Sequence, residues 1–333
     1  MKGTIIDNSG FKTSGIFAND AAVGTGMTFL VGELEKQDPR LLEPLASVTW
    51  PRDIVARTGG GFVDYTSNVF VDYATTGGAN GSGIIGGETN DIATMQANIT
   101  KGVWRVFEFA NILKIPFIDQ QKLQNVGRSL NDILDSGIRL NYNKSIDNIV
   151  YNGVTSLGVT GLVNDPDATT TTAAAVGTGN ATQWSTKTPE QILNDINAVI
   201  TSTWEAAEYD LEGMANHILV PPVQFAALMQ PVTTAGSQSI LEYLLNNNIG
   251  RSQGVDVQIV PSRWCTGAGT AGTDRMVAYV NLEQKVNFDL PVPLNRALTQ
   301  ISVEQFAYLT GYVAQIGQAK FLYYQTVAYV DGI

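Results

Sequence analysis

The stretch 119–152, which contains no proline, most constrains what this chain can fold into. Its apolar residues recur mostly at spacings of three and four, which predicts one apolar stripe along a long helix. At 1.5 Å per residue, such a helix spans roughly 45–50 Å, about the width of a whole domain. Gly153 follows it directly and is expected to cap its C-terminus. The stripe consists of Leu123, Val126, Leu130, Ile133, Leu134, Ile138, Tyr142, Ile146, Ile149 and Val150.

The region after this helix, from 153 to about 290, predicts a compact α/β domain because helical and strand-like segments alternate there. One helix start is well marked: Thr188 is placed as N-cap, Pro189 as first helical residue and Gln191 as the third position of a capping box. We expect further helices over 223–230 and 238–247, and strands over 217–222, 255–262 and 275–280.

Strand-forming sequence lies on both sides of this domain. Residues 49–110 and 299–333 are rich in Val, Thr, Phe, Tyr and Ile, with partial alternation of apolar and polar positions. The glycine-rich segment 77–87 separates two long strand-like runs, so we expect it to form the tip of an extended β-hairpin. Residues 1–48 show little periodicity and are expected to form an extended arm.

The same glycine-rich segment contains a match to the G-x-G-x-x-G pattern of dinucleotide-binding loops, at Gly81, Gly83 and Gly86. A true fingerprint follows directly on a buried strand and opens a helix within a βαβ unit. Here a loop precedes the glycines and strand-like sequence follows them. We therefore interpret the segment as a flexible hairpin tip and expect no bound cofactor.

Enzymatic chemistry has few candidate residues in this chain. His217 is the only histidine, and a catalytic or metal-binding role would have to run through it, with Asp210 or Glu212 as its partner. The alternative is that His217 marks the entry to a buried strand. Cys265 is the single cysteine, with no basic cluster near it, so we expect an unreactive thiol. No metal site is expected.

Composition narrows the function classes further. The 20 basic and 31 acidic residues give a net charge of −11, which opposes strong binding to nucleic acid through counterion release. No run of about 18 apolar residues exists to span a membrane. Only 15% of residues are charged, against about a quarter in an average domain. The chain either covers much of its surface with copies of itself or carries long uncharged loops.

The order of these elements resembles the Hong Kong 97-type major capsid proteins of tailed bacteriophages, and the related encapsulin shells. The resemblance covers nearly the whole chain and includes sequence words after the long helix. YNGVTSLGVTGLVNDP is similar to the turn that enters the family's axial domain, and ANHILVPPVQFAALMQP followed by SILEYLLNNN is similar to its strand, helix and helix. The ending YVDGI also resembles one subgroup of phage capsids.

This resemblance implies an α+β capsid fold with an inserted α/β axial domain (A-domain) and a peripheral domain (P-domain). The implied parts are an N-terminal arm (1–48), the E-loop hairpin with the start of the P-domain (49–118), the P-domain spine helix (119–152), the A-domain (153–290) and the C-terminal P-domain strands (291–333).

The implied function is structural rather than enzymatic. The chain would assemble with itself into hexamers and pentamers, forming an icosahedral shell that encloses phage double-stranded DNA without sequence-specific binding. Portal, scaffold or decoration proteins would be further partners. The shell would be part of the virion and would assemble in the cytoplasm of the host bacterium. An encapsulin-type compartment and an α/β enzyme using His217 remain as alternatives.

Within such a shell the hairpin tip would contact a neighbouring chain. The glycines expected at this contact are Gly77, Gly78, Gly81, Gly83, Gly86 and Gly87. Some family members cross-link a lysine to an asparagine of another subunit. Lys101 lies near the C-terminal base of the hairpin and not at its tip, so that chemistry is not carried over.

Overall fold

The computed structural model describes residues 44, 47–77, 92–125, 130–177, 179–232 and 238–333. The chain divides into two units, Met1–Leu45 and Ala46–Ile333, and every element below belongs to the second. Most of the expected arm, 1–48, lies outside the described residues. The helices are α2 (Trp50–Asp53), α3 (Phe117–Asn125), α4 (Leu130–Asn152), α5 (Pro189–Ala206), α6 (Pro222–Leu228), α7 (Ile240–Asn247) and α8 (Ile249–Ser252).

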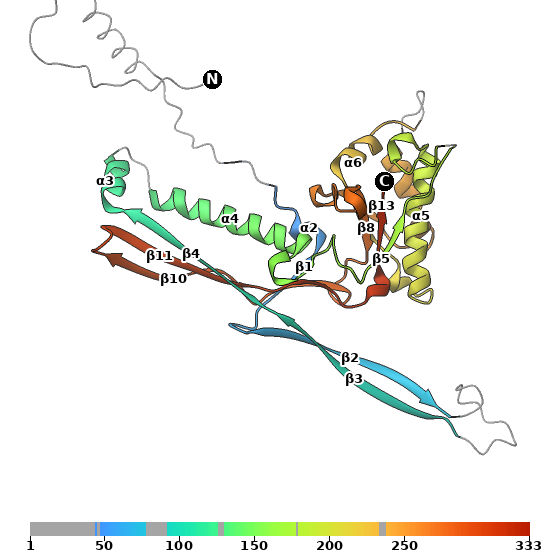
Figure 1. Ribbon diagram of the computed structural model, residues 1–333, viewed down its shortest axis with the longest axis horizontal. Coiled ribbons are helices and arrows are strands. Elements are labelled where there is room, and N and C mark those ends of the chain that lie inside the picture. The colour runs from blue at the N-terminus through green and yellow to red at the C-terminus, as the bar shows by residue number, and fades with distance from the viewer. Residues whose placement is uncertain (1–43, 45–46, 78–91, 126–129, 178, 233–237) are drawn as a thin grey trace, which may run out of the picture. The chain divides into compact units, whose positions relative to one another are not determined.

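The described strands form four sheets, with orders β5-β13-β8-β6-β7, β10-β11-β4, β1-β9-β12 and β2-β3 (Figure 1). Their bounds are β1 (Val55–Thr58), β2 (Tyr65–Thr76), β3 (Thr94–Arg105), β4 (Phe107–Pro116), β5 (Thr169–Thr172), β6 (His217–Val220), β7 (Gln258–Pro261), β8 (Arg275–Tyr279), β9 (Val286–Leu290), β10 (Val292–Ser302), β11 (Ala307–Ile316), β12 (Ala319–Phe321) and β13 (Val327–Asp331).

The five-stranded sheet separates two apolar cores, because successive side chains of a strand point to opposite faces. Ile218, Met276 and Ala328 enter a core with the apolar face of α5, whereas their neighbours Leu219 and Val277 enter a core with α4 and β9. The expected capping box of α5 is present: Thr188 accepts from the Gln191 backbone, and the Gln191 side chain accepts from the Thr188 backbone.

The sheet also takes in a strand that the sequence pattern places elsewhere. β13 lies between β5 and β8, so a C-terminal strand expected beyond the boundary at 290 completes the sheet of the α/β region. The other two long C-terminal strands, β10 and β11, pair with β4 as a separate sheet. The chain passes from the sheet of β11 to the five-stranded sheet through the three buried residues of β12 and the turn that follows them.

Two helices, α3 and α4, stand where the sequence predicts one continuous helix, and the first begins at Phe117 rather than at residue 119. Residues 126–129, which the predicted helix runs through, lie outside the described residues. Leu134 and Ile138 of α4 pack with Leu113 and Ile115 of β4. The ring of Tyr142 packs against Phe109 of the same strand, so the predicted apolar stripe of α4 does face a sheet.

Residues 49–110 are less uniformly β than the sequence predicts. Residues Trp50–Asp53 form the short helix α2, and β1 pairs in parallel with β9. The long run at 92–110 divides at the buried residue Val106, so that β3 belongs to the hairpin and β4 to the next sheet.

The end of α4 is a close turn that depends on Gly153. Its backbone has φ +71°, and its N–H donates to the carbonyl oxygen of Ile149 at 2.9 Å, as expected of a helix C-cap. A Cβ at this position would lie 2.2 Å from the carbonyl oxygen of Val159. Both the backbone conformation and the space therefore require glycine.

We predict opposite effects for alanine at two glycines of this helix. Gly153→Ala should lower the free energy of unfolding by more than about 2 kcal/mol, because it adds left-handed strain to a steric overlap. Gly137→Ala should raise it by about 0.5–1 kcal/mol, because nothing lies within 4 Å of the added Cβ in the interior of α4. Chemical denaturation of both variants measures the difference, and equal effects would contradict this account of the turn.

Candidate functional site

The hairpin formed by β2 and β3 is the part of the described chain that depends most on contacts with other surfaces. Twelve antiparallel pairs join its strands, from Tyr65 opposite Arg105 to Thr76 opposite Thr94. Residues directly opposite each other share a face, so the ladder divides the ribbon into two faces of known composition. A two-stranded ribbon has no core of its own and is marginally stable in water.

One face of the ribbon, here called the apolar face, is fully exposed. It carries Tyr65, Val69, Val71 and Tyr73 from β2, with exposed fractions between 48% and 68%. From β3 it carries Met95, Ala97, Ile99 and Val103, of which Met95 and Ile99 are 72% and 68% exposed. Its only charged residues are Lys101 and Arg105. A contiguous exposed apolar surface of this kind marks a site of protein contact.

The opposite face anchors the base of the ribbon to the rest of the second unit. The ring of Phe70 packs against Trp104 and Tyr323, with 6.4 Å between centroids in each pair. The Lys320 ammonium lies 4.3 Å from the centre of the Trp104 ring and 2.5 Å from Oδ2 of Asp289. This attachment leaves the apolar face turned away from the chain's own core.

The glycine-rich tip is only partly described. Gly77 has φ +83°, a conformation that favours glycine, and it follows directly on β2. The other expected contact residues, Gly78, Gly81, Gly83, Gly86 and Gly87, lie outside the described residues. The strands on either side of the loop are antiparallel neighbours, whereas a dinucleotide fingerprint joins a strand to a helix in a βαβ unit.

The sequence pattern points to the tip of the hairpin but does not reveal the apolar face. The missed signal is the alternation along 65–73 and 95–103, which is easy to mistake for the inward face of a buried strand. Only the register of the ladder shows that both sets of apolar residues share one face.

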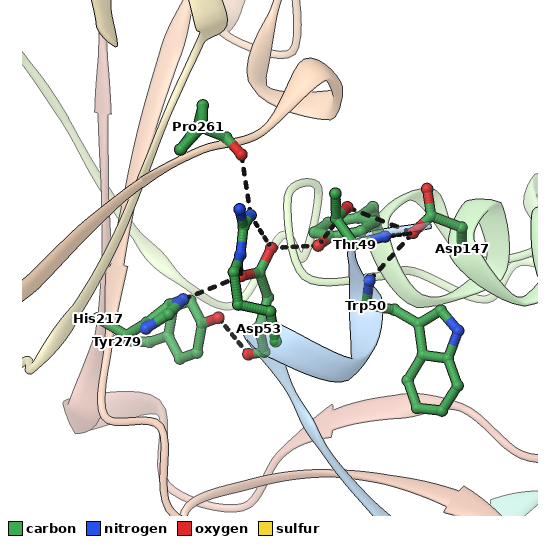
Figure 2. A network of polar contacts seen from close by, with 9 residues as sticks. Thr49, Trp50, Asp53, Asp147, His217, Pro261 and Tyr279 are labelled. Atoms are coloured by element: carbon green, nitrogen blue, oxygen red, sulfur yellow. Dashed lines mark hydrogen bonds and ion pairs between the residues drawn. The ribbon is translucent and has the colours of Figure 1, made fainter. Parts of the chain in front are cut away.

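His217, the only histidine, lies at the start of β6 and is buried, but its partner is neither Asp210 nor Glu212. Its Nε2 lies 3.1 Å from Oδ1 of Asp53 in α2. Figure 2 shows the His217 ring directed at this carboxylate. Asp210 instead accepts a hydrogen bond from the backbone of Glu212, and both are exposed. The proposed pairing of His217 with these two carboxylates is therefore wrong, because a residue 164 positions away takes their place.

Asp53 collects donors from several segments. Arg52 donates to both its oxygens, at 2.6 and 2.8 Å, and the hydroxyl of Tyr151 in α4 donates to Oδ2. The hydroxyl of Tyr279 in β8 donates to the backbone carbonyl of the same residue. Burial alone would raise the pKa of Asp53, but hydrogen bonds from Arg52, His217 and Tyr151 outweigh it and lower that pKa below its usual value.

A second buried carboxylate, Asp147 of α4, caps α2 from outside the helix. Its Oδ1 accepts from the backbone N–H groups of Thr49 and Trp50 at 2.8 and 3.1 Å (Figure 2). Its Oδ2 accepts from Arg263 and Trp264. Together, Asp53 and Asp147 fasten α2 between α4 and the five-stranded sheet.

The burial of this network indicates a structural role and not a catalytic one. Asp53 is 0% and His217 2% exposed, so no substrate reaches either group. Cys265 is also fully buried, and burial raises the pKa of its thiol to about 12, which makes the thiolate scarce. Within the described ranges, no three His, Cys, Asp or Glu side chains gather as a metal site. No helix among those ranges is long and apolar enough to cross a membrane.

Comparison with known proteins shows which family the chain belongs to and which solved structures share its fold. Residues 81–333 match the family model described as "Major capsid protein". The solved structure "The capsid of Myoviridae Phage XM1" matches with a TM-score of 0.75 at 16% identity, over 91% of this chain and 98% of that one. "Microbacterium phage Oxtober96" matches with a TM-score of 0.60 at 13% identity, over 91% and 98%. "Capsid of empty GTA particle computed with C5 symmetry" matches with a TM-score of 0.57 at 11% identity, over 94% and 99%.

At these identities the structural likeness concerns the fold, while the family rests on the sequence match. No curated protein matches the sequence.

The buried network predicts a defined pH dependence for Asp53→Asn. Because the folded-state pKa of Asp53 is lowered, its carboxylate stabilises the fold above its unfolded pKa of about 4, and this contribution is lost as the pH falls through the folded value. The variant should lose about 2 kcal/mol or more of unfolding free energy at pH 7. This deficit should shrink as the pH falls below about 4.

Denaturant unfolding of the wild type and the variant between pH 3 and pH 7 measures this deficit. Asp256→Asn is the matched control, since it removes a carboxylate that is 79% exposed, and it should change the free energy little at any pH. A deficit for Asp53→Asn that stays constant across this pH range would contradict the account.

Proposed function

We propose that the chain builds an icosahedral head from hexamers and pentamers of itself. It belongs to the major capsid protein family, and it is therefore a structural shell protein of a tailed phage and not an enzyme. The resemblance of the sequence to Hong Kong 97-type capsid proteins is confirmed. Of the alternatives, the family match favours a viral shell over an encapsulin compartment and over an enzyme using His217.

The observation that carries the proposal is the apolar face of the ribbon. All twelve of its residues are exposed, and eight of them are apolar or aromatic. Such a face is stable in water only when another surface covers it. A second copy of the same chain is the partner that a shell provides, and rings form when one surface patch repeatedly meets a different patch on the next copy.

We propose that the ribbon and its loop are the E-loop of the capsid fold, reaching over a neighbouring subunit. The tip glycines Gly77, Gly78, Gly81, Gly83, Gly86 and Gly87 would let the loop bend differently against different neighbours, since glycine tolerates backbone conformations that other residues avoid. Chemical support comes from charge as well: Lys101 and Arg105 on the apolar face would meet a chain whose net charge is −11.

The remaining parts follow the same scheme as proposals. Residues 1–48 would form the N-terminal arm. Helices α3 and α4, which cover most of 119–152, would form the spine of the P-domain together with β4, β10 and β11. The five-stranded sheet and its helices within 153–290 form the A-domain, which β13 of the 291–333 segment completes.

The same scheme gives the partners and the place of assembly. The head encloses double-stranded DNA without sequence-specific contacts, meets portal, scaffold or decoration proteins, and assembles in the cytoplasm of the host bacterium. Membership of the capsid family supports this scheme, and the acidic balance of the chain supports loose rather than tight contact with the DNA.

Two double variants, chosen from the register of the ladder, test whether the apolar face is an assembly surface. Val71→Glu with Ile99→Glu places two charges directly opposite each other on the apolar face, at positions that are 48% and 68% exposed. The free energy of unfolding of the isolated subunit should change by no more than about 0.5 kcal/mol, because substitutions at exposed positions affect folding little. Assembly into particles should fall at least tenfold by analytical ultracentrifugation, because the charges must be desolvated at the contact.

The matched control is Thr94→Glu with Gln96→Glu, which adds the same charge to exposed positions of β3 on the opposite face of the ribbon. It should assemble like the wild type. If both double variants assemble equally well, the apolar face is not an assembly surface.

A further inference from the structure

The exposed side of α4 differs from the rest of the described surface. Its buried side carries Ile138, Tyr142, Ile146 and Val150. On the opposite side, positions three or four residues apart carry only amides, a hydroxyl and one ammonium. We call this set the amide stripe: Asn141, Lys144, Ser145, Asn148 and Asn152.

No unneutralised carboxylate accompanies the stripe in this helix after Asp135. Asp135 is bonded to Arg139 at 2.9 Å and to the hydroxyl of Tyr312. Asp147 is 0% exposed and is bonded to Arg263 and Trp264. Lys144 forms no ion pair among the described residues, so in a chain with a charge of −11 this surface is locally neutral to basic.

The amide stripe also lacks the anchors of a protein interface. None of the exposed large apolar side chains of the described chain belongs to α4, whereas the ribbon and β10 expose many. Protein contacts depend on apolar and aromatic anchors that become buried at their centre. The stripe is therefore poorly suited to bind a second copy of the chain.

A polar groove of about 580 Å³ continues the stripe past the end of α4. Ser145, Asn148 and Asn152 line it from the helix, and Thr155 and Asn164 line it from the following turn. None of its lining residues is charged. The polar, carboxylate-free surface thus extends over two segments of the chain.

These features fit the sugar–phosphate backbone of a double helix. Amide and ammonium groups are side-chain donors that bind phosphate oxygens without reading sequence. The Ser145 hydroxyl donates to the carbonyl oxygen of Asn141, and the Asn152 amide donates to Oδ1 of Asn148, so Asn141, Lys144 and Asn148 are the donors that the stripe offers to phosphate. The amide stripe, from Asn141 to Asn152, spans about 18 Å, close to half a turn of B-form DNA. We propose that the amide stripe is the surface that lies against the enclosed double-stranded DNA. This inference rests on the proposed shell function and names the face that meets the DNA.

The contact is weak for each copy and strong only in sum. The stripe carries one ammonium, that of Lys144, which corresponds to a salt slope of about 0.9 per copy, far below that of a dedicated DNA-binding protein. Many copies in one shell add these contacts by avidity. The DNA is therefore lined by donors and not held at fixed positions.

Formaldehyde cross-linking in DNA-filled particles tests the placement directly, because it joins lysine amines to nearby bases. After nuclease and protease digestion, mass spectrometry should find nucleotide adducts on Lys144 and not on Lys101 or Lys114, which are exposed on the ribbon and on β4. Adducts on Lys101 or Lys114 without any on Lys144 would overturn the inference and leave the shell function standing.

Two other outcomes are informative. A protein–protein cross-link at Lys144 would show that a second copy covers the stripe, and it would also overturn the inference. Failure of the chain to form DNA-filled particles at all would count against the proposed function itself.

An isosteric variant gives a second, independent measurement. Asn141→Asp with Asn148→Asp adds two negative charges to the stripe and keeps the side-chain shape. Shells should form normally, but filled particles should release their DNA at a temperature several degrees lower. Gln253→Glu with Gln258→Glu adds the same charge at exposed positions near and on β7, and should release DNA like the wild type. Equal release temperatures for both double variants would contradict the proposal.

Discussion

The structure depends on a constraint of sheet geometry: a ribbon of two strands can bury one face at most against its own chain. Here Phe70, Trp104 and Lys320 use one face to fix the base of the ribbon, and the other face is left with a row of exposed apolar side chains. The chain is thus incomplete as a single molecule. The chain belongs to the major capsid protein family, and we propose that a neighbouring copy in the shell covers this face.

Two buried carboxylates hold the elements of the subunit's body together. Asp53 and Asp147 each accept several hydrogen bonds, and between them they fix α2 to α4, β6 and β8. Such fully bonded buried groups contribute more to a unique geometry than to net stability. His217 therefore belongs to the buried framework that fixes α2, and it is too deeply buried for the catalytic role considered from the sequence.

The sequence predicts features that depend on nearby residues and misses those that depend on distant ones. The capping box at Thr188, the helix end at Gly153 and the hairpin ladder follow from local patterns, and all are present. The pairing of His217 with Asp53, the parallel contact of β1 with β9 and the entry of β13 into the five-stranded sheet join residues far apart in the chain. The apolar face itself required the register, because alternation alone does not say whether a strand's apolar side is covered.

The most direct measurement of the central claim is an electron cryomicroscopy reconstruction of the particles that the full chain forms. The account predicts closed shells of rings in which a neighbouring copy covers Val69, Val71 and Ile99 on the apolar face of each ribbon. Shells in which these side chains remain open to solvent, or a chain that stays monomeric at every concentration, would contradict it.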